Sequence, residues 1–252
     1  MVFTKREKLI LLSASFLALM AAGVGFVFRA MVPAVWGVEF GISDGQVGVL
    51  LGAGLWPIAI MMILFSLVVD KVGYKRSILT ASFFQVLSVL LTYFVNSYDG
   101  MWWACFFAGV GHGIVKAVIN PLCISVFRDE KTKAMNILHA SWPAGIVFGG
   151  TIFLLFFMGD STVPLTWLKS KPAWLFMLIP TIAYAIMFFL CKKFPIDERV
   201  ENNIPISEMF REFGGLGAAL AITFIGYEFF SQLNLFNGGF GGSYTRLIIS
   251  LV

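Results

Sequence analysis

Charged residues are scarce in this chain. Of its 252 residues only 13% are charged, whereas 59% are hydrophobic; an average globular domain has roughly 45–50% apolar and about 25% charged residues. So few charges cannot cover the surface of an ordinary soluble domain, and so apolar a chain is not disordered. The lipid bilayer accepts this composition. At about 20 apolar residues per spanning helix, the chain has room for six or seven spans.

Cysteine is also rare, and two motifs typical of enzymes are missing. Cys105, Cys123 and Cys191 lie in apolar surroundings and form no CxxC pair, so neither a disulfide framework nor a zinc site is predicted. The sequence contains no HExxH and no glycine loop that would cradle a phosphate. We therefore predict a protein that is not an enzyme and that has no cofactor or metal. The net charge of +4 lies in short loops between apolar runs, which argues against nucleic acid as a partner.

Apolar runs separated by charge clusters predict seven spanning helices. The first run follows a basic tail and so resembles a signal peptide. Its length of about twenty residues and the spans that follow favour a retained helix. The predicted helices cover residues 9–32, 47–69, 78–95, 101–127, 134–158, 173–191 and about 210–230.

Basic residues alternate along the predicted loops. Thirteen lie in the N-terminal tail and after the second, fourth and sixth helices, whereas the other loops hold only Lys169 and Lys171. Lysine and arginine are enriched in cytoplasmic loops. The pattern predicts a multi-pass protein of the plasma (inner) membrane with a cytoplasmic N-terminus.

The longest polar stretch follows the sixth helix and suggests a division of the chain. Within residues 194–212, Ile206, Met209 and Phe210 suit a short amphipathic helix on the cytoplasmic surface. We predict a six-helix N-terminal half (1–193), a cytoplasmic connector (194–212), and the start of a C-terminal half with an irregular tail (213–252). The alternative is an ordinary solvated loop.

The loop after the second helix carries a motif. Residues 65–76 read FSLVVDKVGYKR. They resemble the cytoplasmic signature of the major facilitator superfamily, G-x-x-x-D-[RK]-x-G-[RK]-[RK], with Ser66 and Tyr74 as departures. An aspartate at a helix end can accept from the amides of a neighbouring helix N-terminus, and the glycine allows a tight reversal. The alternative is a plain positive-inside loop. The residues that match, and that the resemblance assigns to a cytoplasmic gating motif, are Asp70, Lys71, Gly73, Lys75 and Arg76.

A second block resembles one branch of that superfamily. Residues 109–122 read GVGHGIVKAVINPL, and residues 135–145 read MNILHASWPAG. The fucose and hexose proton symporters likewise have a glycine-rich fourth helix with Asn-Pro, and a fifth helix with Asn-x-Leu-His and an aromatic residue before Pro-Gly. The resemblance covers roughly residues 5–230. It implies an all-α integral membrane fold: a six-helix half of a major facilitator fold plus one further helix. Lys116 departs from the glutamate common at this point of the branch, so its carboxylate proton site does not carry over.

Polar residues inside the spans are the candidates for a cavity at the midplane, because ionisable groups are costly there. His112, Lys116 and Asn120 are spaced four residues apart and share one helix face. The predicted cavity residues are Arg29, Trp56, Gln85, His112, Lys116, Asn120, Asn136, His139 and Trp142.

Each candidate also has a structural interpretation. Arg29 can extend to the outer headgroups, both histidines can bond between packed helices, and Asn120 can bond backbone freed by Pro121. Glycines in spans are usually packing surfaces. Two tryptophans, Trp56 and Trp142, lie deep enough to stack on a sugar. Four others near the span ends are expected in an interfacial belt: Trp36, Trp102, Trp103 and Trp174.

The resemblance implies a secondary transporter of a sugar, a sugar acid or a related small polar solute, with protons as the coupling ion of the branch. A transport-inactive membrane sensor or assembly partner is the alternative. The family has twelve spans in two halves, so we expect this chain to be a truncated reading frame; a dimerising half-transporter is the other interpretation. Lys116 either receives an anionic solute or mimics a protonated carboxylate, and both predict transport that does not depend on the proton gradient.

Overall fold

Helices form every element in the described part of this computed structural model, which comprises residues 3–157 and 167–196 and the single residues 200, 223 and 226. The chain divides into two units, residues 1–197 and 198–252, and the helices below belong to the first. The predicted connector and seventh helix lie almost entirely outside the described residues. The elements are α1 (Lys5–Met31), α2 (Pro33–Phe40), α3 (Asp44–Ala53), α4 (Trp56–Val72), α5 (Tyr74–Phe94), α6 (Tyr98–Val126), α7 (Lys131–Phe157), α8 (Trp167–Phe176) and α9 (Leu178–Leu190).

A polar cap makes α1 start before its apolar run. The Thr4 hydroxyl accepts from the Glu7 amide at 3.2 Å, and the Glu7 carboxylate accepts from the Thr4 amide at 2.8 Å. This reciprocal capping box satisfies donors that would otherwise be left open at the helix start. The basic residues predicted as a tail are therefore the first turn of the helix.

Two of the predicted spans are each divided into two helices. The span predicted at 47–69 is two helices, α3 and α4, separated by Gly54 and Leu55. Pro57 lies in the first turn of α4, where its missing N–H is no loss, but the same residue could not continue α3. The span predicted at 173–191 is likewise divided, into α8 and α9, at Met177.

The short helix α2 was not predicted: the first predicted span ends at Val32, and α2 begins at the next residue. Pro33 occupies its first turn. Gly41 ends it in the left-handed conformation, with φ of 60°, which glycine adopts at little cost. Proline has no N–H to donate to the preceding helix, so Pro33 is where α1 cannot continue and where α2 can begin.

Six segments are long and apolar enough to cross a membrane: Lys5–Met31, Asp44–Val72, Tyr74–Phe94, Tyr98–Val126, Lys131–Leu155 and Lys171–Leu190. They correspond to the six spans predicted for the N-terminal half. The all-α integral membrane fold is thereby confirmed, and the protein crosses the membrane several times.

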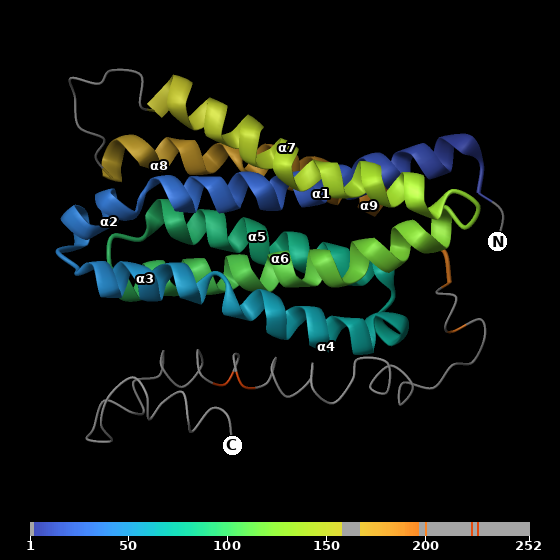
Figure 1. Ribbon diagram of the computed structural model, residues 1–252, viewed down its shortest axis with the longest axis horizontal. Coiled ribbons are helices and arrows are strands. Elements are labelled where there is room, and N and C mark those ends of the chain that lie inside the picture. Colours follow the sequence, from blue (N-terminus) through green and yellow to red (C-terminus); the bar gives the residue numbers. More distant parts are fainter. Residues whose placement is uncertain (1–2, 158–166, 197–199, 201–222, 224–225, 227–252) are drawn as a thin grey trace. The chain divides into compact units, whose positions relative to one another are not determined.

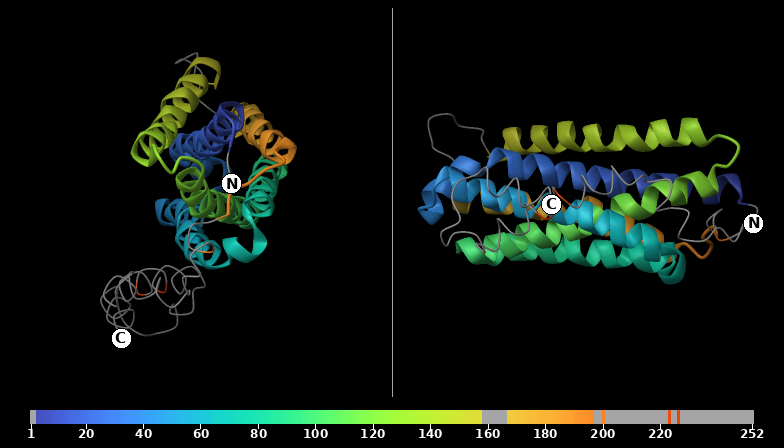
Figure 2. Two further views of the ribbon diagram at one scale, coloured as in Figure 1. Left: turned by 90° about the vertical axis from the view of Figure 1, so that its right-hand side faces the viewer. Right: turned by 60° about the horizontal axis from the view of Figure 1, so that its bottom comes forward.

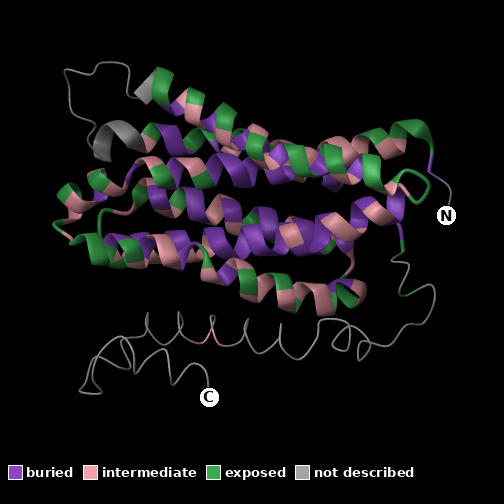
Figure 3. Cartoon of the chain, viewed as in Figure 1, coloured by how far each residue is buried: buried purple, intermediate pink, exposed green. Residues whose placement is uncertain are grey.

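Helix α6 is the central helix of the bundle. It contacts α1, α3, α4, α5 and α7, and 72% of its most apolar window is buried, as the colouring in Figure 3 makes visible. Helix α1 packs along α7 and α9, and α5 packs along α6 and α9, so the helices run side by side along the bundle (Figures 1 and 2). Polar side chains on α6 therefore face protein or an interior cavity.

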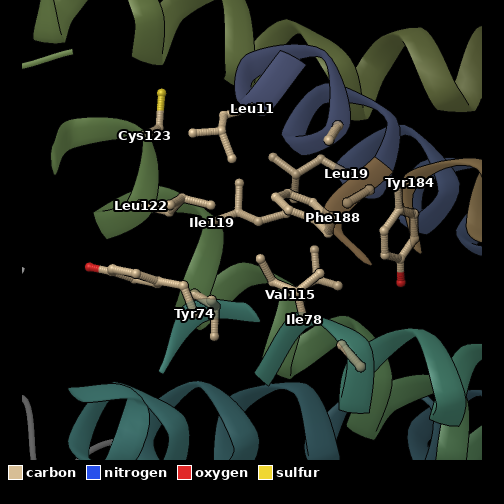
Figure 4. Packing of buried hydrophobic residues seen from close by; sticks show 14 of the residues in the cluster. Leu11, Leu19, Tyr74, Ile78, Val115, Ile119, Leu122, Cys123, Tyr184 and Phe188 are labelled. Atoms are coloured by element: carbon tan, nitrogen blue, oxygen red, sulfur yellow. The ribbon is translucent and has the colours of Figure 1, made fainter. Parts of the chain in front are cut away.

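Close packing holds these helices together. An apolar cluster joins α1, α5, α6 and α9, with Leu11, Ile119 and Phe188 almost completely buried (Figure 4). Gly23 and Gly145 bring the backbones of α1 and α7 into contact, since a Cβ on Gly145 would collide with the Met20 carbonyl oxygen. Lipid tails are as apolar as leucine, so such van der Waals fit and small residues drive association within a membrane.

Candidate functional site

Two cavities lie among α1, α4, α6 and α7, and Lys116 and Trp142 line both of them. One has a volume of about 380 Å³ and includes Asn120 and His139 in its lining; we call it the His139 cavity. The other has a volume of about 330 Å³ and includes Arg29 and His112; we call it the Arg29 cavity. The structure thus brings six of the predicted residues together around two adjoining spaces.

The predicted polar face of α6 is turned toward these cavities. His112, which is 4% exposed, lines the Arg29 cavity. Asn120 lines the His139 cavity, and Lys116, one turn from each, lies between them. Residues four apart lie above one another on a helix face, so the spacing alone places this row along one wall.

Lys116 rests on an aromatic ring. Its ammonium nitrogen lies 4.0 Å from the centroid of the Trp142 ring on α7. The structure shows no hydrogen bond or ion pair for Lys116 within the described residues. A cation over an indole gains about 0.5–2 kcal/mol, the more so where water is excluded. Trp142 therefore supplies partial compensation for a charge held within a span.

Arg29 is bound to the protein far more completely. Its guanidinium donates to the Gly25 carbonyl at 3.1 Å and to the Ser88 hydroxyl at 3.0 Å, and Ser88 donates onward to the Ala104 carbonyl at 2.7 Å. Its Cζ lies 5.3 Å from the Trp174 ring centroid. At 7% exposure the side chain links α1 to α5, α6 and α8 and does not extend to the headgroups.

Arg29 and His112 approach each other at Gly25. A Cβ built on Gly25 would lie 3.3 Å from the Arg29 Nη1 and 3.3 Å from the His112 Cε1. The absence of a side chain on Gly25 gives both groups their place beside the cavity. The Arg29 cavity is therefore lined by three basic side chains, those of Arg29, His112 and Lys116.

Three predicted cavity residues lie elsewhere. Trp56 packs on Phe106, with ring centroids 5.5 Å apart, and Asn136 is exposed on α7. Gln85 is buried between α5 and α9, where its amide oxygen accepts from the Tyr184 hydroxyl at 2.9 Å. None of the three lines either cavity. A polar side chain in a span can face any neighbour, and spacing along one helix does not say which.

The glycines of α6 serve close approach to neighbouring helices. A Cβ on Gly109 would lie 2.8 Å from the Gly54 carbonyl oxygen, and one on Gly113 would lie 2.7 Å from that of Ile58. Gly111 faces the other side, toward Gln85 of α5, with 2.7 Å to its Cγ. These glycines let α6 touch the break between α3 and α4, whose Gly54 and Leu55 also line the Arg29 cavity.

Three residues were not predicted to have a role near the site. Ser88 connects Arg29 to α6, and Tyr184 bonds Gln85. Both are moderately polar residues in apolar helices, which is a weak signal because serine and tyrosine also occur in spans without such partners. Trp174 is a third, expected at the membrane interface.

The expected aromatic belt is only partly present. Trp103 is 51% exposed, as a belt residue should be. Trp36 and Trp174 are instead fully buried, stacked on each other with ring centroids 6.4 Å apart. Burial of these two rings fixes α2 against α8, so nearness to a span end did not predict their surroundings correctly.

The signature loop joins α4 to α5 through Gly73, whose φ of 86° favours glycine. Lys75 donates to the carbonyls of Phe189 at 2.6 Å and of Cys191 at 3.1 Å, at the end of α9. Carbonyls at a helix C-terminus lack partners within the helix and attract cations. Asp70 is half-buried in the last turn of α4, whereas Lys71 and Arg76 are exposed.

The loop ends of the bundle carry further polar contacts. Lys193, after α9, pairs with Glu7 of α1 at 3.0 Å. The start of α1, the α4–α5 loop, the α6–α7 loop and the end of α9 all lie at one end of the bundle (Figure 1). The basic residues of the N-terminal tail and of the loops after the second and fourth predicted helices therefore lie at this end. Lys192 and Lys193, the first basic residues after the sixth, lie there too.

The described residues offer little for catalysis or metal binding. A GxSxG pattern does occur, at Gly41 to Gly45, but Ser43 there caps α3: its hydroxyl accepts from the Gln46 amide at 3.4 Å. A nucleophile elbow needs a strand before the serine, and this serine follows α2. Among residues 3–157 and 167–196 no three histidine, cysteine or acidic side chains come together as metal ligands.

Comparison with known proteins shows what the chain is similar to. A family profile described as Major Facilitator Superfamily matches residues 11–252. No curated protein matches the chain at a significant level. Among solved structures the chain is similar to a crystal structure of tetrameric PepTSo2, with a TM-score of 0.65 and 16% identity. That match covers 98% of this chain and 51% of the other, so the chain spans about half the length of the solved protein. At this identity the likeness concerns the fold alone.

Proposed function

Because the chain belongs to the major facilitator superfamily, we propose that it is a secondary active transporter of a sugar or a related small polar solute. The mechanism would be alternating access, in which two halves rock about a site at the bilayer midplane. Residues 1–193 would form one half, residues 194–212 the connector, and residues 213–252 the start of the other half.

The observation that carries this proposal is the pair of cavities that meet at Lys116 and Trp142. A charged side chain within a span is costly, and it persists where it serves a pathway or a binding site. Volumes of about 330 and 380 Å³ fall at the lower end of the range for small-molecule sites. The cavity residues Arg29, His112, Lys116, Asn120, His139 and Trp142 are thus our proposed solute site.

A sugar-like solute fits the chemistry of these walls. Asn120 of α6 and His139 of α7 both offer hydrogen-bonding groups to the His139 cavity, and Trp142 offers an aromatic ring in the same lining. Hydroxyl groups need such partners when they leave water, and the apolar face of a sugar ring packs well on an indole. The α4–α5 loop would be a second functional region. Its gating motif would consist of Asp70, Lys71, Gly73, Lys75 and Arg76.

Uptake by proteoliposomes tests the transport function. The purified chain is reconstituted and presented with labelled D-glucose, L-fucose and D-glucuronate, with protein-free liposomes as the blank. We expect uptake of at least one solute, lowered at least about tenfold by Trp142→Ala because the aromatic wall is lost. Trp103→Ala is the matched control, since that ring is half exposed on the outside of α6. If no solute enters above the blank, the sensor or assembly role becomes the better interpretation.

The coupling ion is tested with an imposed pH gradient. Lys116 stands where a carboxylate proton site is common in the sugar-symporter branch, so we propose transport that an inward proton gradient does not drive. Uptake should be similar with and without the gradient in the wild type. Strong proton-driven uptake by the wild type contradicts this, whereas coupling that arises only in Lys116→Glu supports it.

We also propose a location, the plasma (inner) membrane, with the N-terminus in the cytoplasm. The basic loops gather at one end of the bundle, and lysine and arginine are enriched on the cytoplasmic side. Reporter domains fused after Lys75 and Lys133 should be cytoplasmic, and one fused after Lys169 should lie outside. A reversed set of locations would overturn the orientation.

A further inference from the structure

The walls of the two cavities carry an excess of positive charge. Arg29 and Lys116 both line the Arg29 cavity, and Lys116 also lines the His139 cavity. No aspartate or glutamate occurs among the described residues that line either cavity. Charges interact more strongly inside a protein than in water, because the effective dielectric constant is lower. These walls therefore favour a negative charge over a neutral group.

The two cations differ in how far a solute can reach them. Arg29 is only 7% exposed and donates from its two terminal nitrogens to Gly25 and Ser88, although its Nε has no partner within the described residues. Lys116 is half-buried. Lys116 contacts the face of Trp142 and has no hydrogen bond or ion pair within the described residues. An ammonium group has three donors and no acceptor. An oxyanion that enters either cavity finds these donors at the shared wall, with the Arg29 charge behind it.

The groups around Lys116 indicate what else such an anion carries. Asn120 lies one helical turn further along α6, and His139 lies across the His139 cavity on α7. Both can bond hydroxyl groups. Trp142 lies beside them and presents a ring to the same space. An anionic group, hydroxyl groups and a flat face on one small molecule describe a sugar acid.

Building on the transport function above, we propose that the solute is a monosaccharide acid whose carboxylate is bound by Lys116. Asn120 and His139 bond its hydroxyl groups, and its ring packs on Trp142. Arg29 lines the same site, where it holds the helices together and adds positive potential, and we assign the carboxylate to Lys116. A neutral sugar would leave the Lys116 ammonium without a counter-charge inside a span, which is the costly arrangement. The carboxylate removes this cost.

Two probes that differ at one carbon distinguish a site for a sugar acid from a site for a neutral sugar. D-Glucuronate and D-glucose share their ring and the hydroxyl groups on it, and at the last carbon glucuronate has a carboxylate where glucose has a hydroxymethyl group. Equilibrium binding of labelled glucuronate to the purified chain, with unlabelled glucose or acetate as competitors, measures the preference at constant ionic strength. We expect glucuronate to bind at least about tenfold more tightly than glucose, and acetate to compete poorly because it lacks hydroxyl groups and a ring.

Variants at Lys116 assign the preference to this residue. Lys116→Gln should weaken glucuronate binding at least about tenfold and leave glucose binding nearly unchanged, so that the preference disappears. Lys116→Arg keeps the charge and should keep the preference. Lys133→Gln is the matched control, because Lys133 is an exposed lysine paired with Glu130 at 3.3 Å. Thermal unfolding of each variant shows that the protein compared is folded.

Several results would overturn the assignment. They are equal binding of the two probes, no saturable glucuronate binding, and a glucuronate preference that survives in Lys116→Gln. Uptake distinguishes this failure from failure of the transport function. If proteoliposomes take up glucuronate equally well with the wild type and with Lys116→Gln, the chain is a transporter and the assignment of the carboxylate to Lys116 is wrong. If glucuronate binds in a Lys116-dependent way but no solute is taken up, the assignment stands and the transport function is wrong.

Discussion

Arg29 and Lys116 line the same cavity, yet the protein holds these two cations in different ways. The region around Arg29 surrounds it with partners from α1, α5 and α8: a carbonyl, a hydroxyl and an indole ring. The region around Lys116 offers it one indole ring on α7. Both residues cost energy to place in a membrane, but only Arg29 recovers that energy from several directional contacts with the fold.

This difference shows that two cations in one site can have different roles, one in folding and one in binding. A cation that joins several helices contributes to folding, because its removal leaves a space and unpaired groups behind. A cation held by a single non-directional contact contributes little to folding and keeps its donors for something else. The difference predicts opposite balances between stability and solute binding at the two positions.

The largest effect on stability is expected from Arg29→Ala. The variant loses two hydrogen bonds and the contact with Trp174 and leaves a cavity among four helices. We expect the free energy of unfolding, measured in mixed micelles, to fall by about 3 kcal/mol. Arg6→Ala, at an exposed position of the same helix, is the control and should change it little. Equal losses in the two variants would mean that the Arg29 contacts carry no net stability.

The next effect concerns a buried neutral pair on the other side of α6. Tyr184→Phe removes the donor to Gln85 and leaves a buried amide oxygen unpaired. The expected loss in unfolding free energy is about 1–2 kcal/mol. Tyr93→Phe serves as the control, since Tyr93 is less buried and its ring contacts that of Phe94. A loss as large as that of Arg29→Ala would show that charge is not what distinguishes the Arg29 region.

Lys75 is a third cation, and its ammonium group donates to backbone carbonyls at the end of the bundle. Lys75→Met removes its bonds to the carbonyls of Phe189 and Cys191. Because the site is partly exposed, water replaces part of this interaction, and we expect a loss of about 1 kcal/mol. The exposed neighbour Lys71 offers the comparison variant, Lys71→Met, which should leave unfolding unchanged. An effect of Lys71→Met equal to that of Lys75→Met would rule out a specific role for the α9 carbonyls.

The smallest effect is expected from Lys116→Met. The loss of the Trp142 contact is offset by removing a charge from the span, and the two side chains are similar in volume. The unfolding free energy should change by less than about 1 kcal/mol, measured beside Lys133→Met. A loss near that of Arg29→Ala would place Lys116 among the structural cations and remove the difference between the two regions.

Much of the architecture could be predicted from local pattern. Apolar runs and charge clusters located all six spans of the described unit, because length and hydropathy are properties of each segment alone. The four-residue spacing of His112, Lys116 and Asn120 likewise placed them on one face. The family signature at Asp70 to Arg76 led to the same superfamily that the family profile matches.

Side-chain surroundings were harder to predict, as four residues illustrate. Gln85 and Trp56 are polar or aromatic within spans, as Lys116 and Trp142 are, but they face α9 and Phe106 instead of the cavities. Trp174 lies near a span end like Trp103, but it is buried. In a membrane protein the core and the lipid-facing surface are both apolar, so hydropathy does not distinguish which face of a helix meets another helix.

The sequence by itself determined that this chain enters a membrane, how many helices cross it in the described unit, which loops are basic, and which α6 residues share a face. Those properties follow from composition and helical period, which involve neighbours along the chain. The tertiary structure alone decided that Pro57 divides a span beside the cavity, that Arg29 is bound by Ser88 and Trp174, and that the Lys116 ammonium lies over the ring of Trp142. Each of these depends on how helices far apart in sequence are rotated and how closely they pack. Contacts of glycines with backbone carbonyls set the distances between these helices.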